Sequence, residues 1–169
     1  LFTNNNSTNL LEDDYSSTSV NSFGFVTNFK KLDNTFNPRR GFKIKSELAY
    51  GWKETYALDP VSNNILKSPN FNGNLSFSSY LGLLKRTTFK IKLSGSTIQN
   101  NILYENELTR IGGYKTIRGF DEESIWVSSF IIGNFEFRYL IDEKSNVFLF
   151  SDFAYTEGKT NIFLRKDYF

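Results

Sequence analysis

Long stretches in which apolar and polar residues alternate constrain the fold of this chain more than any other feature of its sequence. The clearest stretch runs from Gly41 to Lys53, where the even-numbered positions are mostly apolar or aromatic and every charged side chain is odd-numbered. Successive side chains of a β-strand point to opposite faces, so this period of two puts all the charge on one face. The pattern predicts a strand with a different environment on each side.

The same alternation recurs along the chain and predicts about seven strands. They cover residues 22–31, 41–53, 74–84, 87–97, 125–141 and 147–155, with a further run that starts at residue 161. No window approaches the ~20 apolar residues that a membrane-spanning helix requires. With 169 residues, the chain is predicted to be one all-β domain.

Soluble β-sandwiches also alternate, but two features favour a transmembrane antiparallel β-barrel. Most of the predicted strands reach the ~9–11 residues that a tilted strand needs to cross a bilayer. The connections also alternate in length, with short turns at 84–86 and 142–145, a modest bend at 32–40, and long polar connections at 52–73 and 98–124. The uncharged faces would then meet lipid, and the residues expected there are Phe42, Ile44, Leu48, Phe89, Ile91, Phe135 and Phe137, with Val127, Ile131, Tyr139 and Ile141 on the longest strand.

Seven strands with two open edges cannot stand alone in lipid, because lipid does not satisfy free backbone groups. Further strands must therefore complete the barrel. The chain starts at Leu1 without methionine and stops at Phe169 inside a predicted strand. We therefore expect residues 1–169 to be an internal piece of a longer protein and part of one barrel domain.

A glycine-rich segment stands out within the second long connection. It reads Ile-Gly-Gly-Tyr-Lys-Thr-Ile-Arg-Gly-Phe over residues 111–120. Glycine adopts backbone conformations that are closed to other residues, so the chain can turn here and aim the guanidinium of Arg118. The alternation places Glu136 and Asp152 on the inward, polar faces of the next two strands, where they are candidate partners for Arg118.

Strand register makes this expectation more specific. A three-residue turn at 143–145 would put Glu136 directly opposite Asp152, with Cβ atoms ~5 Å apart, and two like charges there are destabilising unless a cation joins them. Arg138, on the same strand face, is one counter-ion. Arg118 is the other, because a planar guanidinium can bond both carboxylates at once. The sequence thus predicts that Arg118 pins an inward-folding loop, residues 98–124, inside the barrel.

Composition argues against several other functions. The chain has no histidine and no cysteine, so the commonest general base and thiolate metal ligands are absent, and we expect neither an enzyme nor a cofactor. A net charge of +2 with dispersed lysines gives no nucleic-acid footprint. The acidic clusters at 12–14 and 121–123 are expected to be solvated, with no metal bound.

Four segments, in order, resemble the outer-membrane assembly factors typified by BamA and TamA. Residues 112–120 are similar to the arginine-glycine-aromatic motif in the sixth extracellular loop of that family. Residues 37–41 resemble its turn before the ninth strand, and residues 134–138 and 150–153 resemble its twelfth and thirteenth strands. The resemblance covers most of the chain and implies roughly the eighth to fourteenth strands of a sixteen-stranded barrel.

The resemblance implies a barrel of the bacterial outer membrane, preceded by POTRA domains, that inserts nascent outer-membrane proteins without covalent chemistry. Its expected partners are the lipid bilayer, client proteins and other assembly subunits. The residues that it assigns to a structural and gating lock are Arg118, Gly119, Phe120, Glu136 and Asp152, supported by Gly112 and Gly113. Two alternatives stay open, a two-partner secretion transporter that shares the loop motif, and a passive porin or soluble β-protein in which the motif is accidental.

Overall fold

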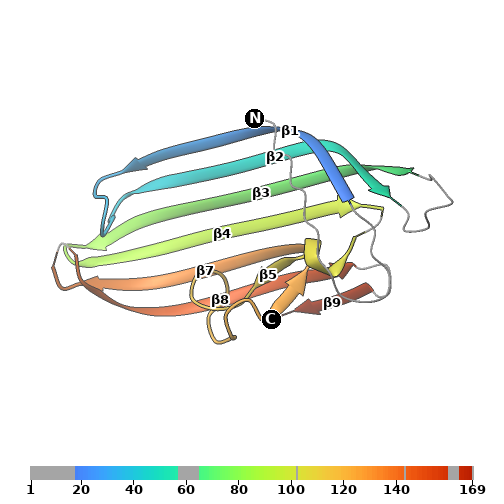
Figure 1. The fold of residues 1–169 in the computed structure, drawn as a ribbon. Helices are drawn as coiled ribbons and strands as arrows, with labels where there is room; N and C mark the ends of the chain where they lie inside the picture. The colour runs from blue at the N-terminus through green and yellow to red at the C-terminus, as the bar shows by residue number, and fades with distance from the viewer. Residues whose placement is uncertain (1–17, 57–64, 102, 143, 160–163, 169) are drawn as a thin grey trace.

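The computed structural model describes residues 18–56, 65–101, 103–142, 144–159 and 164–168, and this part of the chain is all-β, as predicted (Figure 1). No α-helix occurs in these ranges; one short 3-10 helix, η1, covers Glu105–Glu107. The strands are β1 (Thr18–Leu32), β2 (Gly41–Tyr56), β3 (Ile65–Leu84), β4 (Thr87–Asn100), β5 (Thr109–Ile111), β6 (Ile125–Val127), β7 (Ser129–Leu140), β8 (Asn146–Lys159) and β9 (Leu164–Tyr168).

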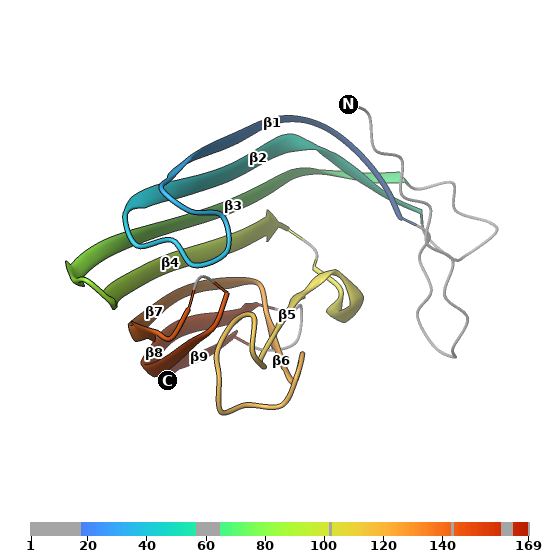
Figure 2. The same cartoon turned by 90° about the vertical axis from the view of Figure 1, so that its left-hand side faces the viewer.

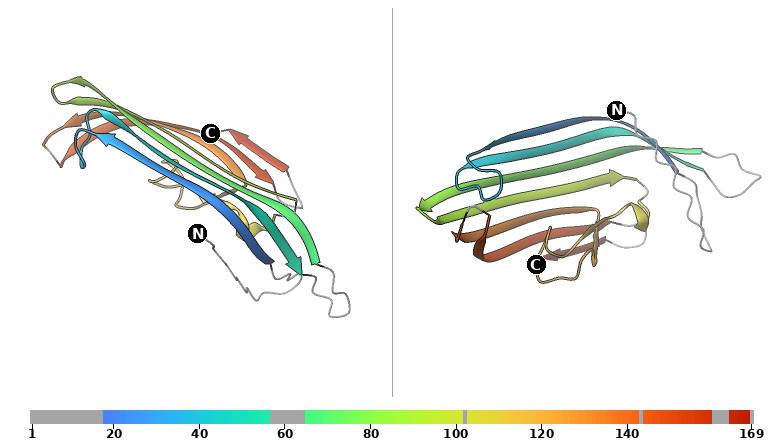
Figure 3. Two further views of the ribbon diagram at one scale, coloured as in Figure 1. Left: turned by 90° about the horizontal axis from the view of Figure 1, so that it is seen from above. Right: turned by 60° about the vertical axis from the view of Figure 1, so that its left-hand side comes forward.

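Six long strands and the short β9 form one antiparallel sheet in the order β1-β2-β3-β4-β7-β8-β9. The sheet is strongly curved and open, with β1 and β9 at its two edges (Figures 1 and 3). Strands β5 and β6 pair only with each other and lie on its concave side (Figure 2). The predicted all-β antiparallel sheet is confirmed, whereas a closed barrel is not seen in the described residues.

The two faces of the sheet differ as the alternation predicts. We call the face that carries the 101–128 connection the inner face, and the other the outer face. On the inner face of β7 and β8, Asn134, Glu136 and Ala154 are each less than a tenth exposed. On the outer face, Phe25 is 69% exposed and Leu149 is 77% exposed. Apolar side chains therefore cover the face with no protein packed against it among the described residues.

The predicted strand at 125–141 is wrong in one respect, because it is two strands. The ladder breaks at Ser128, whose backbone N–H and hydroxyl both donate to the carbonyl oxygen of Glu157, each at 2.9 Å. Residues before the break leave the main sheet and pair with β5. Val127 is consequently 2% exposed and buried beneath the connection, and the expectation that it lies on the outer face is wrong.

The predicted long connection at 52–73 is also wrong, because β2 and β3 extend into it and only residues 57–64, outside the described ranges, separate them. This part of β3 has polar residues on both faces, so the alternation of apolar and polar residues did not reveal it as a strand. Pro69 is compatible with a strand here: it pairs with Trp52 on β2, while pairing with β4 begins only at Asn70. A strand tolerates proline at such a position, where one of its two sides has no ladder partner.

The turn between β1 and β2, residues 33–40, is more than the modest bend that the sequence predicted. Asn146 of β8 donates a 2.6 Å hydrogen bond to Oδ1 of Asn37, and Nη2 of Arg39 donates to the carbonyl oxygen of Leu84 at 2.7 Å. β8 is four strands from β2 in the sheet order, so the turn reaches across the concave side at this end of the sheet (Figure 2).

Asp33 shapes this turn. Its Oδ1 accepts the backbone N–H groups of Arg39 at 2.9 Å and Arg40 at 3.1 Å. Burial acts to raise the pKa of the Asp33 carboxyl. The backbone hydrogen bonds, of which that of Arg40 has the largest effect, outweigh burial and lower this pKa. The carboxylate form therefore fixes the direction in which the turn leaves β1.

The open edges and the apolar outer face make the isolated piece prone to self-association. We expect residues 1–169, expressed alone without detergent, to aggregate, because unpaired edge strands and large exposed apolar patches both template association. Size-exclusion chromatography with light scattering measures this. A monodisperse, soluble, folded monomer would contradict the expectation.

Candidate functional site

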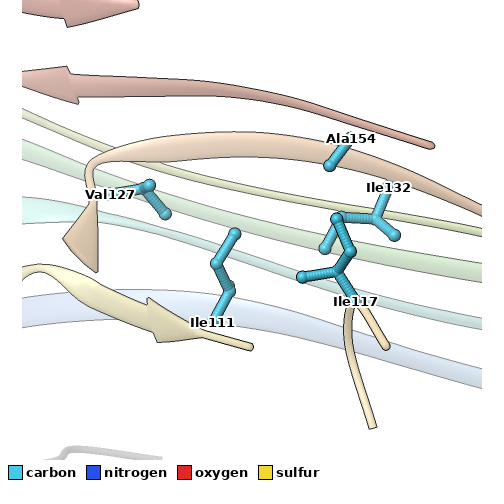
Figure 4. Close-up of a cluster of buried hydrophobic side chains, with 5 residues drawn as sticks. All are labelled: Ile111, Ile117, Val127, Ile132 and Ala154. Carbon is cyan, nitrogen blue, oxygen red and sulfur yellow. The ribbon is translucent and has the colours of Figure 1, made fainter. Parts of the chain in front are cut away.

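The connection between β4 and β7 packs on the inner face through a small apolar cluster. Ile111 and Ile117 from the connection and Val127 from β6 meet Ile132 of β7 and Ala154 of β8, all less than a tenth exposed (Figure 4). Burying each large aliphatic side chain contributes on the order of 1.5–3 kcal/mol. The connection is thus a packed element, and its position on the inner face agrees with the predicted inward fold of 98–124.

Glycines allow the turn that presents Arg118. Gly112 has a φ of +125°, and a Cβ there would lie 2.2 Å from the carbonyl oxygen of Asp121. Gly119, directly after the arginine, has a φ of +93°, which L-residues with side chains rarely adopt. Thr116 closes the turn, because its hydroxyl accepts the N–H of Gly112 at 2.8 Å and donates to the Gly112 carbonyl at 2.7 Å.

Arg118 binds both predicted carboxylates. Its Nε and Nη2 donate to the two oxygens of Asp152 at 2.8 and 2.6 Å, and its Nη1 donates to Oε1 of Glu136 at 2.9 Å. Its backbone N–H also donates to Asp152, at 3.0 Å. All three side chains are less than a tenth exposed. The predicted contact is therefore observed, and the role of this contact in gating stays a prediction.

Polar contacts hold the backbone just before Arg118. Asn134 of β7 donates from Nδ2 to the carbonyl oxygen of Thr116 at 2.9 Å. Lys92 of β4 donates from Nζ to the carbonyl oxygen of Lys115 at 3.0 Å. Two neighbouring strands thus bind the peptide groups that precede the arginine, so its position does not depend on the ion pairs alone.

Two phenylalanines complete the arginine site. The guanidinium carbon of Arg118 lies 4.0 Å from the ring centroid of Phe150 and 5.8 Å from that of Phe148. These rings share the inner face of β8 with Asp152 because they lie two and four residues before it. Sequence reasoning quoted Phe150 as part of a motif but gave it no contact, although its even number already placed it inward.

The charges around the site include more cations than carboxylates. Lys90 lies opposite Glu136 across β4 and β7, and their side chains are 3.1 Å apart; Arg138 reaches the other oxygen of Glu136. Arg138 is thus the counter-ion that the sequence predicted. Hydrogen bonding to Asp152 is the largest influence on the pKa of Arg118, and it raises that pKa further against the effect of burial. The guanidinium stays charged at any physiological pH.

The predicted register between β7 and β8 is wrong by two residues. Asp152 pairs with Asn134, and Glu136 pairs with Phe150, so the two carboxylates are diagonal neighbours instead of directly opposite. The turn is longer than the three residues expected because Asp142 accepts the backbone N–H groups of Lys144 and Ser145, both at 2.7 Å. The shift is even, so both acids keep their inward face, and a guanidinium spans diagonal positions readily.

A second anchor, which sequence reasoning missed, lies at the other end of the connection. Nζ of Lys53 on β2 is 2.5 Å from Oε2 of Glu107 in η1 and 4.5 Å from the ring centroid of Tyr104. The Lys53 side chain is fully buried. The signal available in the sequence was only that Lys53 belongs to the charged face, which does not reveal a contact with a segment about fifty residues away.

This second anchor should be stronger than a surface ion pair. We expect Glu107→Gln to destabilise the connection by about 1–3 kcal/mol, because it removes a carboxylate that is bound to a buried ammonium. The matched control is Glu54→Gln, which removes the partner of the exposed Lys67 and should destabilise far less, because an ion pair in contact with solvent is screened. Amide hydrogen exchange of residues 103–111 measures the difference. Equal exchange in the two variants would contradict it.

The remaining predicted residues have simpler roles. Phe120 contributes its backbone, since its carbonyl oxygen accepts the N–H of Gly113 at 3.1 Å, while its side chain is 38% exposed. Neither acidic cluster of the sequence forms a site in the described residues. Residues 121–123 are exposed, and the cluster at 12–14 lies outside the described residues. Within the described ranges, no group of three or more acidic side chains is arranged to hold a metal ion. In the same ranges no helix is long and apolar enough to cross a membrane.

Comparisons with protein-family models, with curated proteins and with solved structures found no match for this chain.

Proposed function

We propose that this chain is part of a transmembrane β-barrel of the bacterial outer membrane that inserts nascent outer-membrane proteins. The observation that carries the proposal is the clamp in which Arg118, from a glycine-rich connection, is held by Glu136 and Asp152 on the inner face. The same residues carry the resemblance to the assembly factors in the sequence. The proposed role of the clamp is structural, with no covalent chemistry.

The outer face supports the membrane part of the proposal. Large aromatic and aliphatic side chains on it are more than half exposed, for example Phe23 at 63% and Phe153 at 61%. Soluble monomers rarely expose apolar patches of this extent. The six long strands have 12 to 20 residues, whereas a tilted transmembrane strand needs ~9–11. Lipid is the solvent that such a face fits.

The packed connection on the inner face supports the proposal that the protein inserts client proteins. The connection on the inner side of the sheet is packed, ion-paired and anchored at two points, which a passive pore does not require. In the proposed protein it keeps the interior blocked while clients enter at a seam formed by strands outside this chain. A client strand would bind by β-augmentation, in which it adds to an open edge of the sheet through main-chain hydrogen bonds.

The test is client folding by the full-length protein in liposomes. A urea-denatured outer-membrane barrel protein is diluted into liposomes with and without the protein, and folding is followed by the altered electrophoretic mobility of the folded client. We expect folding to be faster when the protein is present. Equal rates would contradict an insertase. Release of a client across the membrane, without its insertion, would instead favour the secretion transporter that shares the loop motif.

A further inference from the structure

A second group of basic side chains lies on the inner face, away from the Arg118 clamp. Lys30 of β1 is directly opposite Lys43 of β2, and Lys45 follows on the same face two residues later. Lys30 and Lys45 are exposed and Lys43 is half-buried. None of the three forms an ion pair within the described part of the chain, in contrast to Lys90 beside Glu136.

Arg40 adds a fourth cation to this group. Gly82 of β3 has no side chain, and the Arg40 side chain crosses the inner face there, with Cγ and Nε both 3.5 Å from where a Cβ of residue 82 would be. The 33–40 turn, held across the concave side by Asn37 and Asn146, places the arginine in this position. We call Lys30, Arg40, Lys43 and Lys45 the basic patch.

Contact with water does not account for the basic patch. Like charges directly opposite each other on an antiparallel pair are destabilising, so the facing of Lys30 and Lys43 has a cost. Serine or asparagine would satisfy a watery surface without that cost, and Ser76 and Ser78 do so on the adjacent strand. The whole chain has a net charge of only +2, so general basicity does not explain the patch either.

Few carboxylates offset the patch. Glu47 lies two residues beyond Lys45 on the same face of β2, at one end of the patch. Asp33 is occupied by the backbone N–H groups of Arg39 and Arg40. Four cations therefore face two carboxylates, and an anionic ligand would relieve the excess.

The spacing of the patch indicates the form of that ligand. Lys43 and Lys45 are two residues apart on one strand, about 6.8 Å along its axis. Carboxylates on alternate residues of an extended polypeptide have the same spacing. Ser78 and Ser76 lie opposite these two lysines on β3 and add hydroxyl groups to the same face. A row of this kind fits repeated anions along a chain better than it fits one compact anion.

We propose that the basic patch binds an acidic segment of a polypeptide in an extended conformation. The identification of this segment as part of a client rests on the proposed function. Alternate carboxylates of the segment lie over Lys43 and Lys45, while Lys30 and Arg40 attract neighbouring charges. Long-range attraction by the patch also draws acidic segments toward this end of the sheet.

The test measures peptide binding to the full-length protein in lipid nanodiscs by fluorescence anisotropy. The probe is a labelled peptide of alternating glutamate and threonine, compared with one of alternating lysine and threonine. The variant Lys30→Gln/Lys43→Gln/Lys45→Gln removes three charges of the patch. Its control, Lys31→Gln/Lys85→Gln/Arg86→Gln, removes three charges at the same end of the sheet but off the inner face, since Lys31 pairs with Phe42 and the other two lie in the turn after β3.

We expect the acidic peptide to bind and the basic peptide not to bind. The acidic peptide should bind about tenfold more weakly to the patch variant than to the wild type, and with unchanged affinity to the control variant. Added salt should weaken the binding. Equal binding of both peptides, or no loss in the patch variant, would overturn the proposal. Tighter binding of inorganic polyphosphate than of the acidic peptide, lost in the patch variant, would overturn it in favour of a phosphate ligand. Client folding in liposomes is measured separately, so its failure with peptide binding intact would count against the proposed function alone.

Discussion

Arg118→Ala should release the connection from the inner face. The substitution leaves Glu136 and Asp152 as two buried carboxylates without their shared cation, and removing one partner of a buried ion pair costs about 3–5 kcal/mol. It also removes the cation that lies over the ring of Phe150. We expect faster amide hydrogen exchange and new protease cleavage in residues 109–127, together with slower client folding.

Arg138→Ala is the matched control. Arg138 is the same residue type and binds the same Glu136, with Nε to Oε2 at 2.7 Å, but it belongs to β7 and holds no part of the connection. Its loss should leave exchange in residues 109–127 close to that of the wild type. Arg118→Lys should restore part of the loss, because an ammonium keeps the charge but not the planar fork that binds both oxygens of Asp152. Normal exchange and activity in Arg118→Ala would mean that the segment is only a turn.

An arginine on the outer face should be much more damaging than one on the inner face. Leu48→Arg places a charge among the exposed apolar residues of β2 and should cost about 2–4 kcal/mol if that face lies in lipid. The control is Asn74→Arg on the inner face of β3, opposite Glu47, which should cost less than about 1 kcal/mol. Chemical denaturation of the full-length protein in detergent or lipid measures both. Equal tolerance of the two substitutions would argue against the membrane assignment.

The sequence was sufficient to predict the faces of most residues in the long strands, because the alternation has a period of two and the ladders keep that period apart from a register shift between Gly82 and Leu84. Glu136 and Asp152 were placed inward for this reason alone. An error of two residues in the register left their faces unchanged, which is why Arg118 was matched to the correct partners despite a wrong turn length. An even error in register leaves the face of each residue correctly predicted, but it changes which residues lie opposite each other and how far apart they are.

Contacts made by irregular segments were not predictable in the same way. The break at Ser128 depends on hydrogen bonds to Glu157, and the burial of Val127 depends on the hairpin that the break creates. Both arise from residues that are well separated in the sequence and share no local pattern. The Lys53 anchor and the crossing of the 33–40 turn to Asn146 have the same origin. Periodicity describes a strand and its two faces, but not what packs on them.

The most direct test of the account is the accessibility of single cysteines in the full-length protein reconstituted in liposomes. This chain has no cysteine, so each introduced thiol in it is a unique probe. Cysteines placed one at a time at positions 44–50 of β2 and at position 137 of β7 are treated with a membrane-impermeant maleimide or with a lipid-soluble one. The account predicts that labelling by the impermeant reagent alternates with a period of two, with Leu48 and Phe137 positions protected and the Glu47 position labelled. Labelling of both faces at the same rate by the impermeant reagent would contradict a sheet that spans a membrane.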